Sequence, residues 1–381
     1  MSESKFQRLN AGIVGGGQGA FIGAVHRIAA ELDGQSLVVA GAMSSDAKRA
    51  QESADAWGLA RSYGSFTEMA AAEADREDGI DFVIVATPNN LHLPVTRAFL
   101  DAGIDVVCDK PLAASLEEAE ELAQIVADSG RLFALTQTYT GYPMVRHARE
   151  MIAAGELGEL RKIQVEYNQD WLKDPIERQG QKQAEWRTDP KRAGISCCVG
   201  DIGTHAHNLV EFIAGSEVQS IAADLSSFVE GRQLDDDANM LLRLDNGAKG
   251  TLVCSQIACG EENALNIRLY GTKGGLEWHQ MEPNTLIFKP ADKPHQKLRT
   301  GGGYLGDGAA AAVTRTPAGH PEGYLEAFAN IYRDFMADLR RVRAGETPLG
   351  NYPGAYDGLR GMRFVEAAVA SSRNGAAWQE V

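Results

Sequence analysis

The stretch that decides the fold runs from Ile80 to Leu112 and reads IDFVIVATPNNLHLPVTRAFLDAGIDVVCDKPL. It holds two apolar runs typical of buried strands, Phe82–Ala86 and Ile104–Cys108, joined by a segment of helical length. Residues suited to chemistry follow each run, Thr87–Asn89 after the first and Asp109–Pro111 after the second. Ligands of open parallel sheets bind outside the carboxyl ends of the strands. The stretch therefore predicts a βαβ unit with a ligand at its strand ends.

The rest of residues 1–135 continues this alternation of strands and helices. Strands that alternate with helices in short units predict a doubly wound parallel sheet with right-handed crossovers. The expected elements are strands at 9–14, 37–43 and 132–136 and helices at 24–32, 47–57, 66–74 and 115–129.

The pattern changes after residue 135. Consecutive strand-like runs with short turns predict an α+β domain over 136–381, with an open, predominantly antiparallel sheet. These runs are 221–229, 238–244, 250–257 and 264–270. Residues 177–193 are polar and irregular, 201–214 are helical, and the Gly- and Ala-rich segment 300–312 is expected to be a mobile loop.

Composition narrows the class of protein. The length of 381 residues favours two domains. The net charge of −15 argues against nucleic acid or an anionic membrane as a partner. Five cysteines, an odd number, suggest a reducing compartment. No signal-peptide pattern or membrane-length apolar run is visible, so we expect a cytoplasmic protein.

A glycine-rich turn, GGGQGAFIG at Gly15–Gly23, follows the first strand and opens the first helix. Glycines in this place let backbone N–H groups approach a diphosphate, which also meets the helix N-terminus. The turn therefore predicts a dinucleotide site, with a purely structural turn as the alternative. Gly15-x-Gly17-x-x-Ala20 fits the fingerprint, but Gly23 is a second candidate for its third position.

The end of the second strand bears on the choice of cofactor. Ser44 and Ser45 with nearby Arg49 suit a 2′-phosphate and favour NADP over NAD. Asp46 could instead serve the ribose hydroxyls, or simply cap the next helix. The expected cofactor contacts are Gly15, Gly17, Gln18, Gly19, Ala20, Phe21, Ile22, Ser44, Ser45, Arg49, Thr87, Pro88, Asn89, His92, Asp109 and Lys110.

In these motifs the chain resembles the Gfo/Idh/MocA oxidoreductases over nearly its whole length. The motifs that carry the resemblance are the glycine turn, Thr87-Pro88-Asn89 with His92, Asp109-Lys110-Pro111 at the family's Glu-Lys-Pro position, Gly155-Glu156-Leu157-Gly158 and Gly200-Asp201-Ile202-Gly203-Thr204-His205. The resemblance implies a Rossmann N-terminal domain, a homodimer or homotetramer formed through the open sheet, and a catalytic group of Lys110, Asp201 and His205.

The chemistry of these three residues agrees with such a role. Oxidation of a secondary alcohol removes a hydroxyl proton as hydride leaves carbon, and His205 suits general-base work near neutral pH. Asp201 lies at i, i+4 from His205, on one face of a helix, where it could orient the histidine or bind a second hydroxyl. Lys110 could polarise the reacting oxygen. A lone histidine on a helix is more often structural, and His207 fits that description.

Two departures from the family pattern affect the site. Asp109 replaces the usual glutamate, and Ser196-Cys197-Cys198 replaces a glycine-rich run. Adjacent cysteines do not match zinc-ligand spacing, so we expect no metal.

The sequence thus predicts an NAD(P)-dependent enzyme that moves hydride to or from a secondary alcohol of a sugar, glycoside or cyclitol. The alternatives are a ketosugar or anhydrosugar reductase, or a non-catalytic NAD(P)-binding regulator. Candidate substrate contacts, several of which are as well suited to core or interface roles, are Lys110, Tyr139, Tyr142, Gln169, Trp171, Asp201, His205 and His320.

Overall fold

The computed structural model describes residues 7–381, which divide into two compact units. The first unit contains the chain up to Gly141 together with Tyr324–Leu359, and the second contains Tyr142–Gly323 together with Arg360–Val381. The expected division at residue 135 differs from this in its C-terminal part, because 324–359 returns to the first unit.

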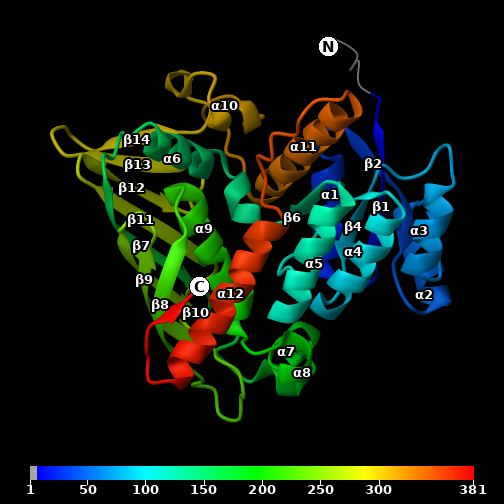
Figure 1. Cartoon of the computed structure of the whole chain (residues 1–381), viewed down its shortest axis with the longest axis horizontal. Helices are drawn as coiled ribbons and strands as arrows, with labels where there is room; N and C mark the ends of the chain where they lie inside the picture. The colour runs from blue at the N-terminus through cyan, green and yellow to red at the C-terminus, as the bar shows by residue number, and fades with distance from the viewer. Residues whose placement is uncertain (1–6) are drawn as a thin grey trace. The chain divides into compact units, whose positions relative to one another are not determined.

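The first unit is built on a parallel sheet with strand order β3-β2-β1-β4-β5-β6 (Figure 1). This order confirms the predicted doubly wound fold, and its direction reverses between β1 and β4, where ligands bind in such sheets. The strands are Leu9–Gly15 (β1), Ser36–Ala42 (β2), Arg61–Ser62 (β3), Phe82–Ala86 (β4), Asp105–Cys108 (β5) and Phe133–Leu135 (β6).

Side-chain caps explain where several helices of this unit begin. Ser115 accepts a hydrogen bond from the Glu118 amide at 3.2 Å, and the Glu118 carboxylate reaches back to the Ala114 amide at 3.1 Å. The helical segments are Phe21–Glu31 (α1), Ala47–Trp57 (α2), Phe66–Ala74 (α3), Asn89–Leu91 (η1), His92–Asp101 (α4), Leu116–Ser129 (α5), Thr138–Gly141 (η2) and Tyr324–Arg343 (α11).

Helix α11 belongs to the first unit because its apolar face completes that unit's core. Phe328, Tyr332 and Phe335 are fully buried, and the rings of Phe335 and Phe82 lie 5.4 Å apart between centroids. Burial of a phenylalanine side chain contributes about 1.5–3 kcal/mol. Sequence distance hides this membership, because α11 packs against α1 from the opposite end of the chain (Figure 1).

The second unit is built on a sheet with strand order β14-β13-β12-β11-β7-β10-β9-β8-β15. It is predominantly antiparallel, as predicted, and β7 and β10 form a parallel pair. The strands are Leu160–Asn168 (β7), Val218–Ser226 (β8), Asp237–Leu244 (β9), Lys249–Ser255 (β10), Ala264–Gly271 (β11), Gly274–His279 (β12), Thr285–Pro290 (β13), Gln296–Arg299 (β14) and Gln379–Glu380 (β15).

Helices cover one face of this sheet, with α6 and α9 packed directly against its strands (Figure 1). Along β9 the side chains alternate between buried and exposed, and Leu241 on the other face is 52% exposed. The helical segments are Pro143–Ala153 (α6), Ile176–Gln179 (η3), Lys182–Arg187 (α7), Pro190–Ala193 (α8), Val199–Gly203 (η4), Thr204–Ala214 (α9), Gly303–Leu305 (η5), Ala309–Val313 (α10) and Ala355–Arg373 (α12), the last of which spans both units.

Three segments of this unit differ from the sequence expectation. Residues 300–312 are not a structureless loop, since η5 and α10 form there, with Leu305 and Val313 buried and the Glu150 carboxylate accepting the Ala309 amide at 2.5 Å. Residues 177–193 hold the short helices α7 and α8, which Gln181 and Asp189 cap. The expected helix at 201–214 begins in a π-helical turn, η4.

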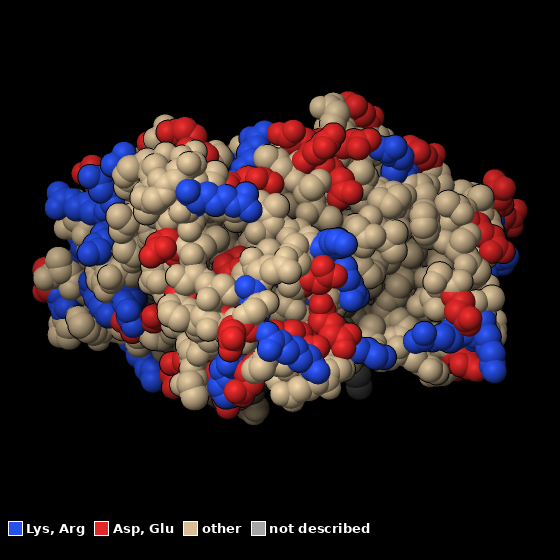
Figure 2. Space-filling model, turned by 90° about the horizontal axis from the view of Figure 1, so that it is seen from below, with Lys and Arg blue, Asp and Glu red and all other residues tan. Residues whose placement is uncertain are grey.

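The surface carries both signs of charge. Acidic and basic side chains both occur over the face shown in Figure 2. Among the helices of residues 7–381, none combines the length and apolarity needed to cross a membrane.

Candidate active site

Three glycines of the turn in the first unit pack so tightly that a side chain would not fit there. A Cβ at Gly15 would lie 2.4 Å from the Ala86 carbonyl oxygen, and one at Gly17 would lie 2.7 Å from the Met43 carbonyl oxygen. A Cβ at Gly23 would lie 2.4 Å from the Gly16 Cα. Gly23 therefore makes the close helix contact of the fingerprint's third glycine, while Ala20 is the N-cap of α1.

The N-terminus of α1 is free of competing groups. Ala20 provides no side-chain cap, and the first turn holds no acidic residue. The amides at the start of the helix therefore suit an anion, and the residues present fit the diphosphate of a dinucleotide. Two expected contacts have other partners, since the Ala20 amide donates to Gly17 O at 3.0 Å and the Gln18 amide to Ser53 Oγ at 3.3 Å. Phe21 is 70% exposed.

The end of β2 offers hydroxyls and a guanidinium to the adenosine end of a cofactor. Ser45 and Arg49 are exposed and Ser44 is half-buried. Asp46 caps α2, with its Oδ1 accepting the Arg49 amide at 2.8 Å. The capping role considered for Asp46 is therefore present.

His92, one of the expected cofactor contacts, links two turns of the backbone. Its side chain is fully buried at the start of α4, with Nδ1 2.8 Å from Pro111 O and Nε2 3.1 Å from Thr87 O. Burial lowers the pKa of His92, although the nearby Asp109 charge opposes this. This buried side chain therefore holds the turns after β4 and β5 together.

The turn after β5 presents Lys110 between two anchored neighbours. Asp109 Oδ1 accepts the Lys110 amide at 2.9 Å and the Thr136 hydroxyl at 3.1 Å. Burial would raise the pKa of Asp109, but contact with His26 and the charges of Lys110 and His92 lower it to about 2. Asp109 is therefore a fixed anion beside Lys110.

The two tyrosines after the last strand of the first sheet serve the core. Tyr139 is 6% exposed and belongs to the first unit, whereas Tyr142 is 2% exposed and begins the second. The Tyr142 ring packs 5.4 Å from Trp278, and its hydroxyl lies 3.4 Å from Gln280 Nε2. Both side chains therefore have the packing expected of core residues, and their contact with a substrate stays a prediction.

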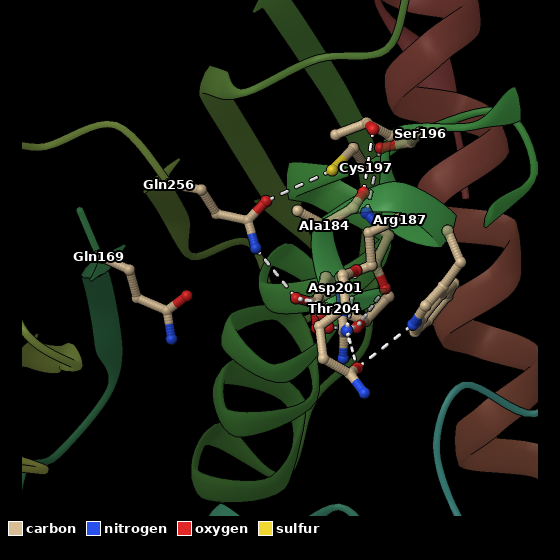
Figure 3. A network of polar contacts seen from close by, with 12 residues as sticks. Gln169, Ala184, Arg187, Ser196, Cys197, Asp201, Thr204 and Gln256 are labelled. Atoms are coloured by element: carbon tan, nitrogen blue, oxygen red, sulfur yellow. Dashed lines mark hydrogen bonds and ion pairs between the residues drawn. The ribbon is translucent and has the colours of Figure 1, made fainter. Parts of the chain in front are cut away.

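Asp201 lies in the π-helical turn of the second unit, where two side chains hold its carboxylate (Figure 3). Arg187 Nε donates to Asp201 Oδ2 at 3.2 Å, and Gln256 Nε2 donates to the same oxygen at 2.9 Å. The π turn changes the simple i, i+4 helix geometry assumed for Asp201 and His205, and such turns often occur at functional sites. Gln256 was not found from the sequence.

His205 stands at the start of α9 beside a polar cluster on neighbouring strands. It is 8% exposed, and its ring lies 6.4 Å from the Tyr167 ring between centroids. The Tyr167 hydroxyl donates to Asn263 Oδ1 at 2.7 Å, and Gln169 Nε2 donates to the same oxygen at 2.6 Å. The sequence suggested Gln169 but not its neighbour Tyr167, and it could not show Asn263, which only the register of β7 against β11 brings to Gln169.

The three other residues considered from the sequence, Trp171, His320 and His207, have different surroundings. Trp171 lies under the Arg187 guanidinium, whose Cζ is 5.8 Å from the ring centroid. His320 is exposed on a segment that the buried Glu322 carboxylate anchors. His207 is structural, as considered, since it is buried, lies 3.2 Å from Glu211 Oε1 and stacks on Phe364.

The two adjacent cysteines belong to the packing of the π turn. Cys197 Sγ lies 3.5 Å from Gln256 Oε1, and the Asp235 carboxylate accepts the Cys197 amide at 3.0 Å. Burial raises the pKa of both thiols, and Cys198 contacts the Cys254 thiol. No group of three or more His, Cys, Asp or Glu side chains in residues 7–381 is arranged to hold a metal ion.

Comparison with known proteins agrees with this architecture. Residues 9–137 match the model of the oxidoreductase family with an NAD-binding Rossmann fold, and residues 145–277 match that of the GFO/IDH/MocA C-terminal domain. A solved oxidoreductase from Sinorhizobium meliloti is 47% identical, with 98% of this chain and 99% of that chain covered and a TM-score of 0.87.

Two relatives carry more specific names. An inositol dehydrogenase homologue from Azotobacter vinelandii, solved with NAD+, is 37% identical, with 98% of each chain covered and a TM-score of 0.92. The same homologue has also been solved with NADH and myo-inositol. Levoglucosan dehydrogenase from Pseudarthrobacter phenanthrenivorans is 28% identical over 71% of this chain and 73% of its own. The chain therefore belongs to the Gfo/Idh/MocA family and is an NAD(P)-dependent oxidoreductase acting on CH–OH groups.

Proposed function

We propose that this chain catalyses the reversible oxidation of a secondary alcohol on a cyclitol, sugar or glycoside, with Lys110, Asp201 and His205 as its reacting groups. The observation that carries the proposal is the Asp201–His205 segment, in which a π turn and a fixed carboxylate precede a histidine beside a hydrogen-bonding cluster. The bound nicotinamide would accept or donate the hydride, and the protein orients the reacting carbon.

Each residue has a distinct role in the proposal. His205 takes the hydroxyl proton as the carbonyl forms, and returns it in the reverse direction. Lys110 donates a hydrogen bond to the reacting oxygen and stabilises the charge that develops there. Asp201 orients a substrate hydroxyl or His205 itself, and Arg187 and Gln256 keep its carboxylate in one position.

The substrate class is supported by the chemistry around His205. Tyr167, Gln169 and Asn263 supply a hydroxyl and two amides, which suit the vicinal hydroxyls of a polyol. The Azotobacter vinelandii homologue solved with myo-inositol supports a cyclitol in particular. An anhydrosugar is the second candidate, favoured by the similarity to levoglucosan dehydrogenase.

For the cofactor we propose NADP in preference to NAD. Exposed Ser45 and Arg49 with half-buried Ser44 support recognition of a 2′-phosphate, and Asp46 has one carboxylate oxygen engaged as a helix cap. The Azotobacter vinelandii homologue solved with NAD+ supports the other choice. Fluorescence titration with NADPH and NADH measures the ratio of the two dissociation constants. Tighter binding of NADH would contradict the proposed preference for NADP.

We also propose that the chain is a homo-oligomer that pairs through the open face of the second sheet. Apolar Leu241 is 52% exposed on that face. Light scattering after gel filtration measures the mass, and a monomer would contradict the proposal. The cytoplasm remains the compartment that we expect.

The deciding experiment is an absorbance screen for reduced nicotinamide over inositols, monosaccharides, glycosides and levoglucosan. Turnover of a polyol supports the proposal, and Lys110→Ala should then lower kcat at least about 100-fold while the cofactor still binds. Near wild-type turnover in that variant would refute the role of Lys110. Cofactor binding without turnover of any polyol, in either direction, would refute the substrate class.

A further inference from the structure

A row of three polar side chains, Tyr332, His26 and Asp109, leads to the turn that carries Lys110. The Tyr332 hydroxyl on α11 lies 2.6 Å from His26 Nδ1 on α1, and His26 Nε2 lies 3.7 Å from Asp109 Oδ1. Tyr332 and His26 have no exposed surface, whereas the Asp109 side chain is 16% exposed. These three polar side chains therefore extend from the core to Asp109, the residue next to Lys110.

The distances indicate how the hydrogen bond between Tyr332 and His26 orients the imidazole. When the Tyr332 hydroxyl donates to Nδ1, a neutral imidazole carries its proton on Nε2, which faces Asp109. The edge of the Phe328 ring, 4.9 Å away between centroids, fixes the plane of the histidine. Buried polar groups cost stability unless they are paired. His26 Nε2 is buried without a hydrogen-bond partner among the described residues, and it faces the Asp109 carboxylate.

Asp109, the last of the three polar residues, contacts the backbone of Lys110. Asp109 Oδ1, the oxygen that His26 faces, also accepts the Lys110 amide at 2.9 Å. Thr136 Oγ1 donates to the same oxygen at 3.1 Å. Any change in the position or charge of this carboxylate is therefore passed directly to the peptide that carries Lys110.

We propose that His26 and Tyr332 are positioning residues that keep the Asp109 carboxylate ionised and seated against the backbone of Lys110. The inference rests on the role proposed above for Lys110. The separation of 3.7 Å is longer than a hydrogen bond, so the contact is electrostatic.

Removal of His26 has a defined effect on the acid side of the pH range. The titratable groups facing Asp109 are His26 on α1, His92 on α4, Lys110 beside it, the Cys108 thiol on β5 and Tyr332 on α11. Burial favours the neutral acid, and contact with His26 is the first effect that opposes it. Without His26 the pKa of Asp109 rises, so the carboxylate is lost at a higher pH than in the wild type.

The test compares His26→Gln with His207→Gln. The two histidines are a matched pair, because both are buried and both face a carboxylate, Asp109 or Glu211, whose pKa is lowered to about 2. His207 lies outside the proposed machinery. Carbon-13 NMR of the Asp109 carboxyl measures its titration, and the amide resonance of Lys110 should follow the same curve. This measurement needs no substrate.

The expected result is a carboxyl titration moved to higher pH in His26→Gln and unmoved in His207→Gln. With the fastest polyol of the screen, the acid limb of kcat should move in the same direction and kcat should fall about tenfold, while the KM for cofactor changes less than about twofold. Tyr332→Phe should give the same changes to a smaller extent.

A double mutant separates positioning from packing. If His26 acts through Asp109, then His26→Gln has no further effect on kcat in an Asp109→Asn background. Additive losses, or equal titration curves in the two glutamine variants, would overturn the inference. An active Lys110→Ala enzyme instead refutes the role proposed for Lys110, and the absence of polyol turnover refutes the proposed substrate class, so these failures are distinguishable from a failure of the inference.

Discussion

Replacement of Gly23 by alanine tests whether the glycine turn binds the cofactor. The added Cβ would lie 2.4 Å from both Cα and O of Gly16, and neither backbone atom can rotate away. Ordinary carbon contacts are about 3.5 Å, so the helix and the turn must separate by about 1 Å.

Two effects of this substitution on the free energy of unfolding oppose each other. Overpacking costs about 1–3 kcal/mol, while alanine within a helix gains about 1 kcal/mol over glycine. We therefore expect a loss of stability of no more than about 2 kcal/mol. A shift of about 1 Å at the diphosphate is more serious, and we expect the Kd for NADH or NADPH to rise at least tenfold.

Gly361→Ala is the matched control. Gly361 lies within α12, and a Cβ there would meet nothing within 4 Å. It should raise the melting temperature slightly and leave cofactor affinity unchanged. Fluorescence titration and thermal unfolding of both variants are the assays. Cofactor affinity within twofold of the wild type in Gly23→Ala would refute the reasoning, because the fingerprint would then tolerate a side chain at its tightest contact.

Three further predictions concern other parts of the chain. Arg187→Gln removes one of the donors to Asp201, and kcat/KM for the best polyol should fall about 10- to 100-fold (about 1.4–2.8 kcal/mol) with unchanged cofactor affinity. An unchanged kcat/KM would show that the Arg187 guanidinium is not needed to hold the carboxylate. The pKa of Glu211 is lowered to about 2, below the usual glutamate pKa near 4.3. Its ion pairs therefore contribute on the order of 3 kcal/mol to the free energy of unfolding above about pH 4.3, and this contribution is lost as the pH falls toward 2. Urea unfolding over this pH range should show that the free energy of unfolding falls less steeply in Glu211→Gln than in the wild type. The same pH dependence in both proteins would contradict the stabilising role of the Glu211 ion pairs. Leu241→Arg should lower the mass measured by light scattering without lowering the far-UV circular dichroism, and an unchanged mass would place the interface elsewhere.

The sequence was sufficient for the first sheet because its strands are short, apolar and regularly separated by capped helices. It was also sufficient for Lys110, Asp201 and His205 as candidates, since each lies in a local motif. It did not reveal the pairing of Tyr167 with Asn263, because the two residues are 96 positions apart and only the register of β7 against β11 brings them together. The π turn at Asp201 was equally hidden, since no simple residue preference distinguishes it from an α-helix.

The return of α11 to the first unit has a consequence for the order of folding during synthesis. The ribosome completes the first sheet by residue 135, but the aromatic side chains that cover it, Phe328 and Phe335 among them, are made only after the whole sheet of the second unit up to β14. Throughout that interval the nascent first unit exposes apolar surface that later becomes core. A fragment that ends near Gly141 would retain that surface permanently, so expression of the N-terminal segment alone should yield aggregated material, whereas a fusion of 7–141 to 324–359 would restore the missing cover.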